Sequence, residues 1–326
     1  MCLVPRPNRI RLSIIIPYLE RGNDRLSALI AFLGRHNLND VQVVIFDQSK
    51  QPCRQIPKPV TYIHSPHCGH SPYSPGAARN EAIKYATGDY IFFMDADLEF
   101  DCGFVDWLQQ RMYFLAKIGK QAFDMYPCLY LSCSYSKQIL IDYEQCLVSY
   151  LSGENDVVDG IALASSCLLI NKLWFCQLQG FDERFFGHGG EDLELIHRLI
   201  LHYPVMPRPE DYHLNIKCQH PGWYKGFRAY ASYYSVEHLF TRHFLVHRWH
   251  PRPLTHKYHR RRVNNDRLLE LCLMNCQLIS TPLPCVLKPD ISSDSFIEWL
   301  GRVQQHFDFN EEKFPGLYRH TINVQR

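Results

Sequence analysis

Two aspartates separated by one residue follow an apolar run in the first third of the chain. Residues 90–94 (YIFFM) lead directly into Asp95-Ala96-Asp97. On an extended chain, side chains two residues apart point the same way, so both carboxylates could face one hard cation. A divalent ion held there could neutralise the charge of a departing diphosphate. Acidic turns after strands are also common without any ligand, and this second interpretation stays open.

A glycine-rich segment followed by two acids is the more specific signal. In Gly187-His188-Gly189-Gly190-Glu191-Asp192, the paired glycines would let the backbone approach a ligand closely. Glu191 and Asp192 then open a predicted helix. A carboxylate that stays ionised but loses its water suits a general base that takes a proton from a hydroxyl. The alternative is that both acids only cap the helix. We expect the buried stripe of this helix to be Leu193, Ile196, Leu199 and Ile200.

A pair of histidines lies three residues apart near residue 250. His247 and His250 could both reach one metal ion from a helical turn or a tight loop. The chain contains 17 histidines, so a chance pair is the competing interpretation. Further ligands at zinc-finger spacing do not flank the pair, so we expect no zinc centre built from this segment alone.

Two sets of basic residues could meet anions. Arg79 lies where residues 75–80 open a predicted helix, and it could reach a phosphate or a base. The second set lies within residues 248–262 and would suit a peripheral contact with anionic lipid head groups or an anionic polymer. A solvated face is the alternative for both sets. The members of this basic cluster are Arg248, Arg252, Lys257, Arg260, Arg261 and Arg262.

The elements that must position these residues alternate between strands and helices over the first hundred residues. We expect strands at 11–16, 41–46, 60–64 and 90–94, with helices that start at Asp24 and span 76–86. This alternation predicts a largely parallel sheet covered on both faces, with ligands beyond the carboxyl ends of its strands. Pro17, Asp47 and Asp95 fall at such ends. Later elements are predicted at 103–115, 126–133, 268–278 and 295–306.

The composition is that of a globular protein. With 46% hydrophobic and 21% charged residues in 326, disordered and fibrous classes are excluded, and a net charge of +2 does not indicate a nucleic-acid partner. Apolar runs stay well short of the roughly 18 residues of a membrane span, and the first residues do not read as a signal peptide. The 13 cysteines include no CxxC pair. We therefore expect reduced thiols and a cytoplasmic location.

Taken in order, these segments resemble GT-A glycosyltransferases. Residues 12–17 and 76–97 resemble the nucleotide-binding half of family 2 transferases. Residues 180–192 resemble the carboxyl half of β-1,4-galactosyltransferases and of bacterial chondroitin-type capsule polymerases. The resemblance implies an α/β fold of GT-A type, Rossmann-like, with a mostly parallel twisted sheet and helices on both faces. It also implies a GT-A domain over 1–262, divided near residue 102 into nucleotide-sugar and acceptor halves, and a short helical extension over 263–326.

The resemblance further implies roles for individual residues. Asp97, His247 and His250 would hold Mn²⁺ or Mg²⁺, Asp192 would be the base that activates the acceptor hydroxyl, and Glu191 would hold the acceptor. The loop over sugar and acceptor would be formed by His188, Gly189 and Gly190. The donor would be bound by Pro17, Tyr18, Arg21, Asp47, Gln48, Arg79 and Asp95.

The activity implied is a metal-dependent, inverting transfer of a hexose unit from a UDP-sugar to a hydroxyl of a glycan or lipid-linked glycan. Bacterial capsule or lipopolysaccharide synthesis at the inner membrane face would be its setting. His188 stands where the family usually has tryptophan, so the acceptor stays open. Two alternatives remain, namely a retaining transferase of the same fold and a non-catalytic glycan-binding protein on a decayed transferase fold. A sugar nucleotidyltransferase would need a glycine-rich loop with a basic residue after the first strand, and residues 17–20 offer none.

Overall fold

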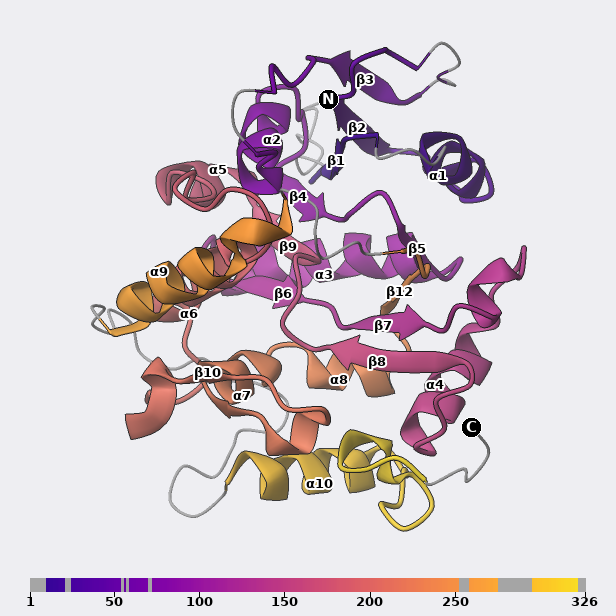
Figure 1. Ribbon diagram of the computed structural model, residues 1–326, viewed down its shortest axis with the longest axis vertical. Coiled ribbons are helices and arrows are strands. Elements are labelled where there is room, and N and C mark those ends of the chain that lie inside the picture. Colours follow the sequence, from indigo (N-terminus) through magenta and orange to yellow (C-terminus); the bar gives the residue numbers. More distant parts are fainter. Residues whose placement is uncertain are drawn as a thin grey trace, which may run out of the picture.

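A six-stranded sheet forms the centre of the computed structural model, which describes residues 10–20, 25–53, 56, 59–69, 72–251, 258–274 and 295–321. The strand order is β3-β2-β1-β4-β9-β6 (Figure 1). The β1–β2, β1–β4 and β2–β3 pairs are parallel, whereas β9 runs antiparallel to both β4 and β6. The predicted α/β class with a mostly parallel sheet is confirmed. The strands are β1 (Leu12–Tyr18), β2 (Val41–Asp47), β3 (Thr61–His64), β4 (Tyr90–Phe93), β6 (Phe123–Met125) and β9 (Leu168–Asn171).

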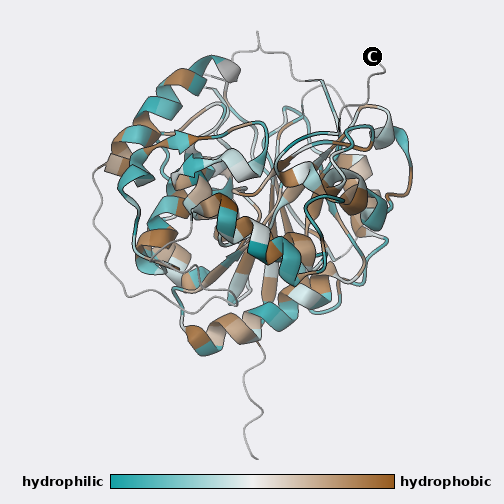
Figure 2. Cartoon of the chain, turned by 90° about the horizontal axis from the view of Figure 1, so that it is seen from below, coloured by the Kyte–Doolittle hydropathy of each residue, from teal (hydrophilic) through white to brown (hydrophobic). Residues whose placement is uncertain are grey.

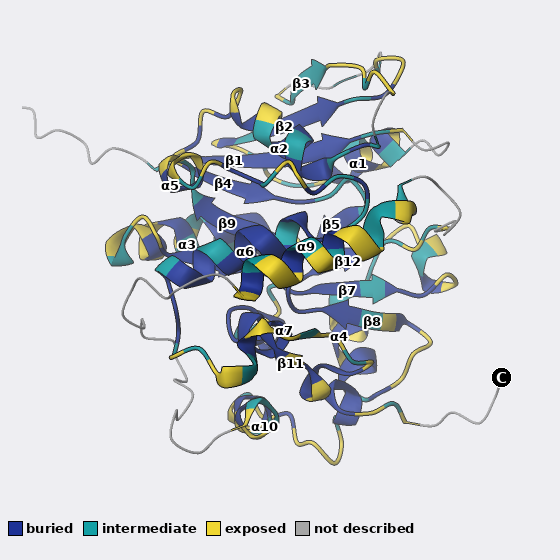
Figure 3. Ribbon diagram, turned by 60° about the vertical axis from the view of Figure 1, so that its left-hand side comes forward, coloured by how far each residue is buried: buried dark blue, intermediate teal, exposed yellow. Residues whose placement is uncertain are grey.

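The first strand extends two residues beyond its predicted end. Its pairing with β4 ends at Ile15, whereas its pairing with β2 continues through Pro17 to Tyr18. Beyond Ile15 the strand therefore has a neighbour on one side only, where the missing N–H of a proline costs little. The inner strands β1 and β4 are buried along their whole length, and the edge strand β3 is only half-buried (Figure 3).

Three helices follow the first strands, as the alternation predicts. In α2, Ser74 caps the start by accepting the Ala77 N–H at 3.2 Å, and Pro75 takes the first helical position. Of the apolar residues at helical spacing in α1, Leu26, Leu29 and Leu33 are buried and Ile30 is half-buried, while its expected cap, Asp24, lies outside the described residues. The helices are α1 (Arg25–Leu33), α2 (Pro75–Ile83) and α3 (Phe104–Ile118).

A second sheet, of four strands in the order β5-β12-β7-β8, places distant segments side by side. Strand β12 pairs antiparallel with β5, so that His247 lies opposite Leu98, and parallel with β7, so that His247 also lies opposite Tyr130. The predicted strand at 126–133 corresponds to β7, while β5 and β12, of three residues each, were not predicted because so short a run carries no period. The strands are β5 (Leu98–Phe100), β7 (Cys128–Leu131), β8 (Val158–Ala162) and β12 (Leu245–His247).

The remaining elements include two C-terminal helices that pack onto the rest of the chain. Helix α9 lies against α6, and α10 lies against α8. Peripheral helices carry both hydrophilic and hydrophobic bands (Figure 2), and α10 begins with a capping box formed by Ser295 and Glu298. The predicted extension over 263–326 begins inside α9. These elements are α4 (Tyr143–Leu151), α5 (Lys172–Gln177), α6 (Glu191–His202), α7 (Phe227–Ser232), α8 (Val236–Phe240), α9 (Arg262–Met274), α10 (Phe296–His306), β10 (Asn215–Ile216) and β11 (Lys225–Gly226).

Candidate active site

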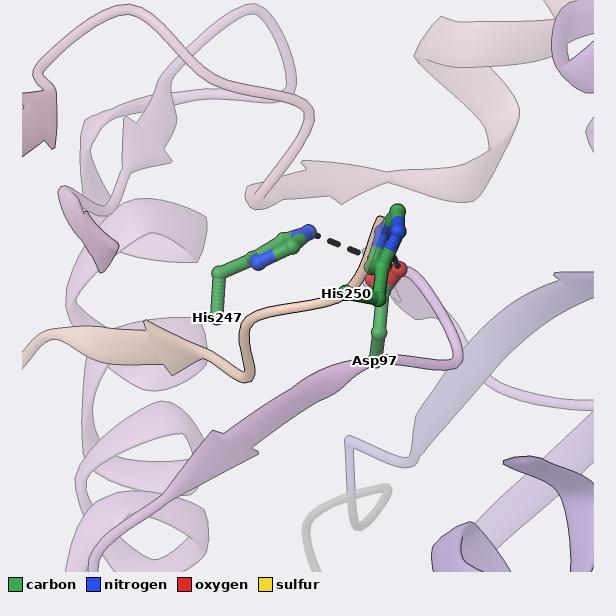
Figure 4. Close-up of side chains that lie close together, drawn as sticks. All are labelled: Asp97, His247 and His250. Carbon is green, nitrogen blue, oxygen red and sulfur yellow. Dashed lines mark ion pairs between the residues drawn. The ribbon is translucent and has the colours of Figure 1, made fainter. Parts of the chain in front are cut away.

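Three side chains that can bind a metal ion converge where β12 meets the turn after β4. The Nε2 atoms of His247 and His250 lie 3.4 and 3.2 Å from Oδ2 of Asp97 (Figure 4). The backbone holds the two segments together, because the Arg248 N–H donates to the Asp97 carbonyl at 3.0 Å. The predicted pairing of the two histidines with Asp97 is therefore present in space, although about 150 residues separate them in the chain.

The donor set fits a divalent ion. Ligand atoms about 2.1 Å from one ion are separated by roughly 3.0 Å in octahedral and 3.4 Å in tetrahedral geometry. The two histidine–aspartate separations fall in this range, and the three ligand atoms lie within 4.8 Å of one another. Although burial acts in the opposite direction, the two imidazoles hold the pKa of Asp97 well below its ordinary value.

The expectation that Asp95 and Asp97 face one cation is wrong for this conformation. The chain turns at Ala96 and Asp97, so the alternation of an extended strand is lost. Asp95 instead places Oδ1 2.5 Å from the Arg79 guanidinium. Asp97 meets Arg25 of α1, whose Nη1 lies 3.2 Å from Oδ2. The sequence did not single out Arg25, because nothing in its spacing relates it to the acidic turn.

A buried arginine joins Asp95 to the glycine-rich segment. The guanidinium of Arg79, which is 1% exposed, lies 3.6 Å from Glu191 as well as 2.5 Å from Asp95, and it covers the ring of Phe181. Burial disfavours its charged form, but the two carboxylates raise the pKa of Arg79 above its ordinary value. The alternative of a solvated face is therefore wrong for Arg79. It links the acid after β4 to the start of α6.

The glycine-rich segment leads directly into α6, as predicted. Gly190 has a φ of 101° and takes the cap position, where a Cβ would come within 2.7 Å of the Phe185 ring. Glu191 is buried behind it, while Asp192 is half-buried and accepts the Leu193 N–H at 2.9 Å. The whole predicted stripe of this helix is buried, namely Leu193, Ile196, Leu199 and Ile200.

We expect stability to depend on the titration of Glu191. Burial, and then the charge of Asp192, raise the pKa of Glu191 to about 7; Arg79 opposes this shift, but its nearer partner is Asp95. Between its ordinary pKa of 4.5 and about 7 the folded protein binds more protons than the unfolded chain, so this contribution to stability is lost as pH rises. Glu191→Gln should remove a decline on the order of 3 kcal/mol, measured by urea unfolding from pH 4.5 to 8. The exposed Glu210→Gln should keep the wild-type slope, and an unchanged slope in Glu191→Gln would contradict the assignment.

The glycine-rich loop is fastened by a residue that the sequence did not indicate. The buried side-chain amide of Asn265, in α9, donates to the carbonyls of Phe186, His188 and Gly189 at 3.2, 3.2 and 2.8 Å. The His188 ring lies beside Tyr258, at 5.5 Å between ring centroids. The loop is therefore held by α9, which starts at Arg262, far from the loop in the sequence.

Removing this amide is expected to loosen the loop. Asn265→Ala leaves three carbonyls of half-buried residues without this donor, at a cost of about 1–3 kcal/mol in the free energy of unfolding. The resemblance implies that this loop covers the acceptor, so the variant should also raise the KM of the acceptor more than that of the donor. Chemical denaturation and steady-state kinetics measure the two effects, and Asn264→Ala, at an exposed position of the same helix, is the matched control. Equal behaviour of the two variants would show that the loop does not depend on Asn265.

The predicted donor-binding residues at the ends of β1 and β2 lie side by side. Tyr18 pairs with Asp47, and the Gln48 N–H donates to the Tyr18 carbonyl at 2.9 Å. Asp47 is buried and accepts the Ser49 N–H at 2.8 Å and the Tyr62 hydroxyl at 2.5 Å. Pro17, one residue before, pairs with β2 as well. Arg21 lies outside the described residues.

Several arginines of the basic cluster contact other residues of the protein. The Arg248 guanidinium lies 2.6 Å from Glu99 and donates to the carbonyls of Ser136 and Gln138, so it fixes the turn after β12. Arg262 lies 2.9 Å from Asp266 and Arg261 covers the Phe186 ring, while residues 252 and 257 lie outside the described part. A peripheral membrane contact stays a prediction for Arg260 and the undescribed members. In the part of the chain that is described, no helix has the length and apolarity of a membrane span.

A hollow of about 470 Å³ opens beside the histidine pair. A smaller one, of about 180 Å³, lies on the other side, against Arg25 and Asp97. Trp249, which is 44% exposed, and His250 line both. The candidate ligands are therefore reached from two spaces, the larger lined by His247 and His250 and the smaller by Asp97 and His250. The larger hollow is lined by Tyr130, Asp159, Lys217, His247, Trp249 and His250, among others.

Comparisons with known proteins place the chain in a family. Among solved structures, TarS 1–349 of S. aureus aligns at 17% identity and TM-score 0.39, over 59% of this chain and 56% of that one. The mannosyltransferase PcManGT of Pyrobaculum calidifontis, in complex with GDP-Man and Mn²⁺, aligns at 14% identity and TM-score 0.35, over 59% and 52%. The alignments thus span about half of those chains, and no curated protein sequence matches. The model of the family described as "Glycosyltransferase like family 2" matches residues 39–275. Because this match covers well over half of the sequence, the chain belongs to that family of glycosyltransferases.

Proposed function

We propose that this glycosyltransferase transfers a hexose unit from a UDP-sugar to a glycan hydroxyl, with inversion and with the aid of a divalent metal ion. The convergence of Asp97, His247 and His250 carries this proposal. They meet beside the turn that follows β4, and in doubly covered sheets ligands bind beyond strand ends of this kind.

The ion that suits these residues is Mn²⁺ rather than Mg²⁺. Mg²⁺ takes oxygen ligands almost exclusively, whereas two of the three ligands here are imidazoles. When bound, such an ion would neutralise the charge that develops on the leaving diphosphate. Asp97 would hold the ion directly, while Asp95, fixed by Arg79, would face the donor from the same turn.

The donor nucleotide would lie along the ends of β1 and β2. Asp47 is held rigid by the Ser49 N–H and the Tyr62 hydroxyl, so that it and the neighbouring Tyr18 and Gln48 form an ordered edge. Such an edge suits recognition of a uracil ring and its ribose, and the resemblance assigns Arg21 to the donor as well.

Asp192 would take the proton from the acceptor hydroxyl. It lies in the first turn of α6 in a half-buried position, where a substrate hydroxyl could reach its carboxylate. Its neighbour Glu191, protonated over part of the neutral range, could donate a hydrogen bond to an acceptor oxygen. A single base that activates the attacking hydroxyl gives in-line displacement and inversion, in keeping with the resemblance of residues 180–192 to β-1,4-galactosyltransferases and chondroitin-type polymerases.

The setting we propose is bacterial capsule or lipopolysaccharide synthesis, on a glycan or lipid-linked glycan acceptor at the inner face of the membrane. The nucleotide-sugar half would end near residue 102 and the acceptor half near 262. Because α9 contacts α6 and its Asn265 holds the glycine-rich loop, we assign this helix to the acceptor half as well.

Calorimetric titration with UDP and with UDP-linked GlcNAc, GalNAc, Gal, Glc and GlcA tests the proposal. Each titration is run with Mn²⁺, with Mg²⁺ and with a chelator. We expect binding that depends on the metal, is stronger with Mn²⁺, and prefers one sugar. No binding under any condition would favour the non-catalytic alternative. With the preferred donor, proton NMR of the first product distinguishes inversion from retention, because the coupling constant of the new anomeric proton reports its configuration.

A further inference from the structure

Arg228, in α7, is a buried arginine with few polar contacts. The residue is 8% exposed, and its Nε donates one hydrogen bond to the side-chain oxygen of Asn215 at 3.1 Å. The described part of the chain gives its two Nη groups no hydrogen-bond partner and places no carboxylate within ion-pair distance. The other buried arginine of the site, Arg79, has two carboxylates beside it.

The surroundings of Arg228 are those of the candidate acceptor site. Burial lowers the pKa of Arg228, and the charge of Asp192 is the largest influence that opposes this. Arg262, whose Nη1 lies 3.4 Å from His188 of the glycine-rich loop, and Tyr130, which lines the larger hollow, also act on its charge. Arg228 is therefore within electrostatic reach of the candidate base, of that loop and of the wall of the hollow.

The segment that follows β10 belongs to this wall, because Lys217 lines the hollow. Asn215, the hydrogen-bond partner of Arg228, begins β10 and lies only two residues before Lys217. A guanidinium taken out of water without a carboxylate partner is unfavourable, and a bound anion would offset that cost. The planar fork of arginine is suited to bind both oxygens of a carboxylate or phosphate at once.

We propose that Arg228 binds an anionic group, a carboxylate or a phosphate, on the acceptor, so that the acceptor is an acidic sugar chain. This inference rests on the proposed function, because it takes Asp192 as the base that meets the acceptor hydroxyl. We assign the anion to the acceptor rather than the donor because the proposed function already gives the diphosphate of the donor to the metal ion at Asp97 and the histidine pair, whereas the charge nearest to Arg228 in effect is that of the candidate base Asp192. Lys217 adds positive potential along the path into the hollow.

Matched pairs of small acceptors test the proposal by binding alone. The protein, loaded with UDP and Mn²⁺, is titrated with p-nitrophenyl β-D-glucuronide and p-nitrophenyl β-D-glucoside, which differ only at C6, and with glucose 6-phosphate and glucose. We expect one anionic probe to bind at least about tenfold more tightly than its neutral partner. The preferred pair identifies the anion as carboxylate or phosphate.

Variants of Arg228 then test whether this residue causes the preference for the anionic probe. Arg228→Met should abolish it without loss of UDP affinity or of melting temperature, and Arg228→Lys should keep part of it. Arg242→Met, at an exposed position paired with Glu144, is the control and should keep all of it. Equal affinities in the wild type, or a preference that survives Arg228→Met, would overturn the proposal. A preference for UDP-glucuronate over UDP-glucose that Arg228→Met removes would place the anion on the donor and overturn it too.

Failure of the proposed function would be visible separately. In that case UDP would not bind with Mn²⁺, and the same probe pairs titrated into the unloaded protein would still report whether Arg228 selects an anion. A drop in melting temperature in Arg228→Met, with the preference intact, would mark the residue as structural only.

Discussion

Asp192→Asn is expected to lower turnover by about 10²-fold or more while the affinity for UDP stays nearly unchanged. Asparagine has the same shape but cannot take up a proton, so the loss falls on the chemical step. Its side-chain oxygen can still accept the Leu193 N–H that Asp192 accepts at 2.9 Å, so the start of α6 should be preserved. The measurements are kcat from UDP release and UDP affinity by calorimetry, both with Mn²⁺.

The control for this variant is an acid in a comparable place without a role in the site. Asp106 also lies in the first turn of a helix, α3, and is exposed, so Asp106→Asn should behave as wild type. If Asp192→Asn weakens UDP binding as much as turnover, the residue serves donor binding and the base must be sought elsewhere. If turnover is unchanged, no proton is removed at this position.

The central sheet and the start of α6 could be predicted from the sequence because each is marked by a local pattern of residues. A buried parallel strand such as β2 is a continuous apolar run, and a glycine pair followed by two acids marks the turn into α6 on its own. Pro17, Asp47 and Asp95 could be placed at strand ends for the same reason. The different partners of Asp95 and Asp97 escape such an argument, because Arg79 and Arg25, which pair with them, lie far away in the sequence.

The parts of the site that sequence reasoning missed depend on contacts between distant segments. Asn265 is one of two adjacent asparagines, and only the packing of α9 on α6 decides that it, and not Asn264, is buried against the loop. Arg228 lies in an aromatic stretch with no periodic pattern to mark it. The histidine pair could be predicted only in part. Its spacing is visible in the sequence, but its position beside Asp97 depends on the pairing of β12 with β5, and β12 is too short to predict.

Asp97→Ala should abolish the metal dependence of UDP binding. Asp97 is the one carboxylate among the three candidate ligands, and its loss would leave two imidazoles beside the Arg25 guanidinium, which repels a cation. Loss of a group that only orients a ligand typically costs 10–100-fold in metal affinity, so loss of the ligand itself should cost at least about 10²-fold. Mn²⁺ binding is measured by electron paramagnetic resonance, and UDP affinity by calorimetry with and without Mn²⁺.

The fold should survive this change, which makes the result interpretable. Arg248 donates to the backbone carbonyl of residue 97, not to its side chain, and β5 and β12 remain paired. Asp101→Ala, at an exposed position just after β5, is the control and should keep full metal dependence. If Asp97→Ala still binds Mn²⁺ and UDP as the wild type does, the histidine–aspartate cluster is a hydrogen-bonded turn and not a metal site. If the variant loses Mn²⁺ binding but keeps its affinity for UDP, then UDP binds without the metal ion, through residues such as Asp47.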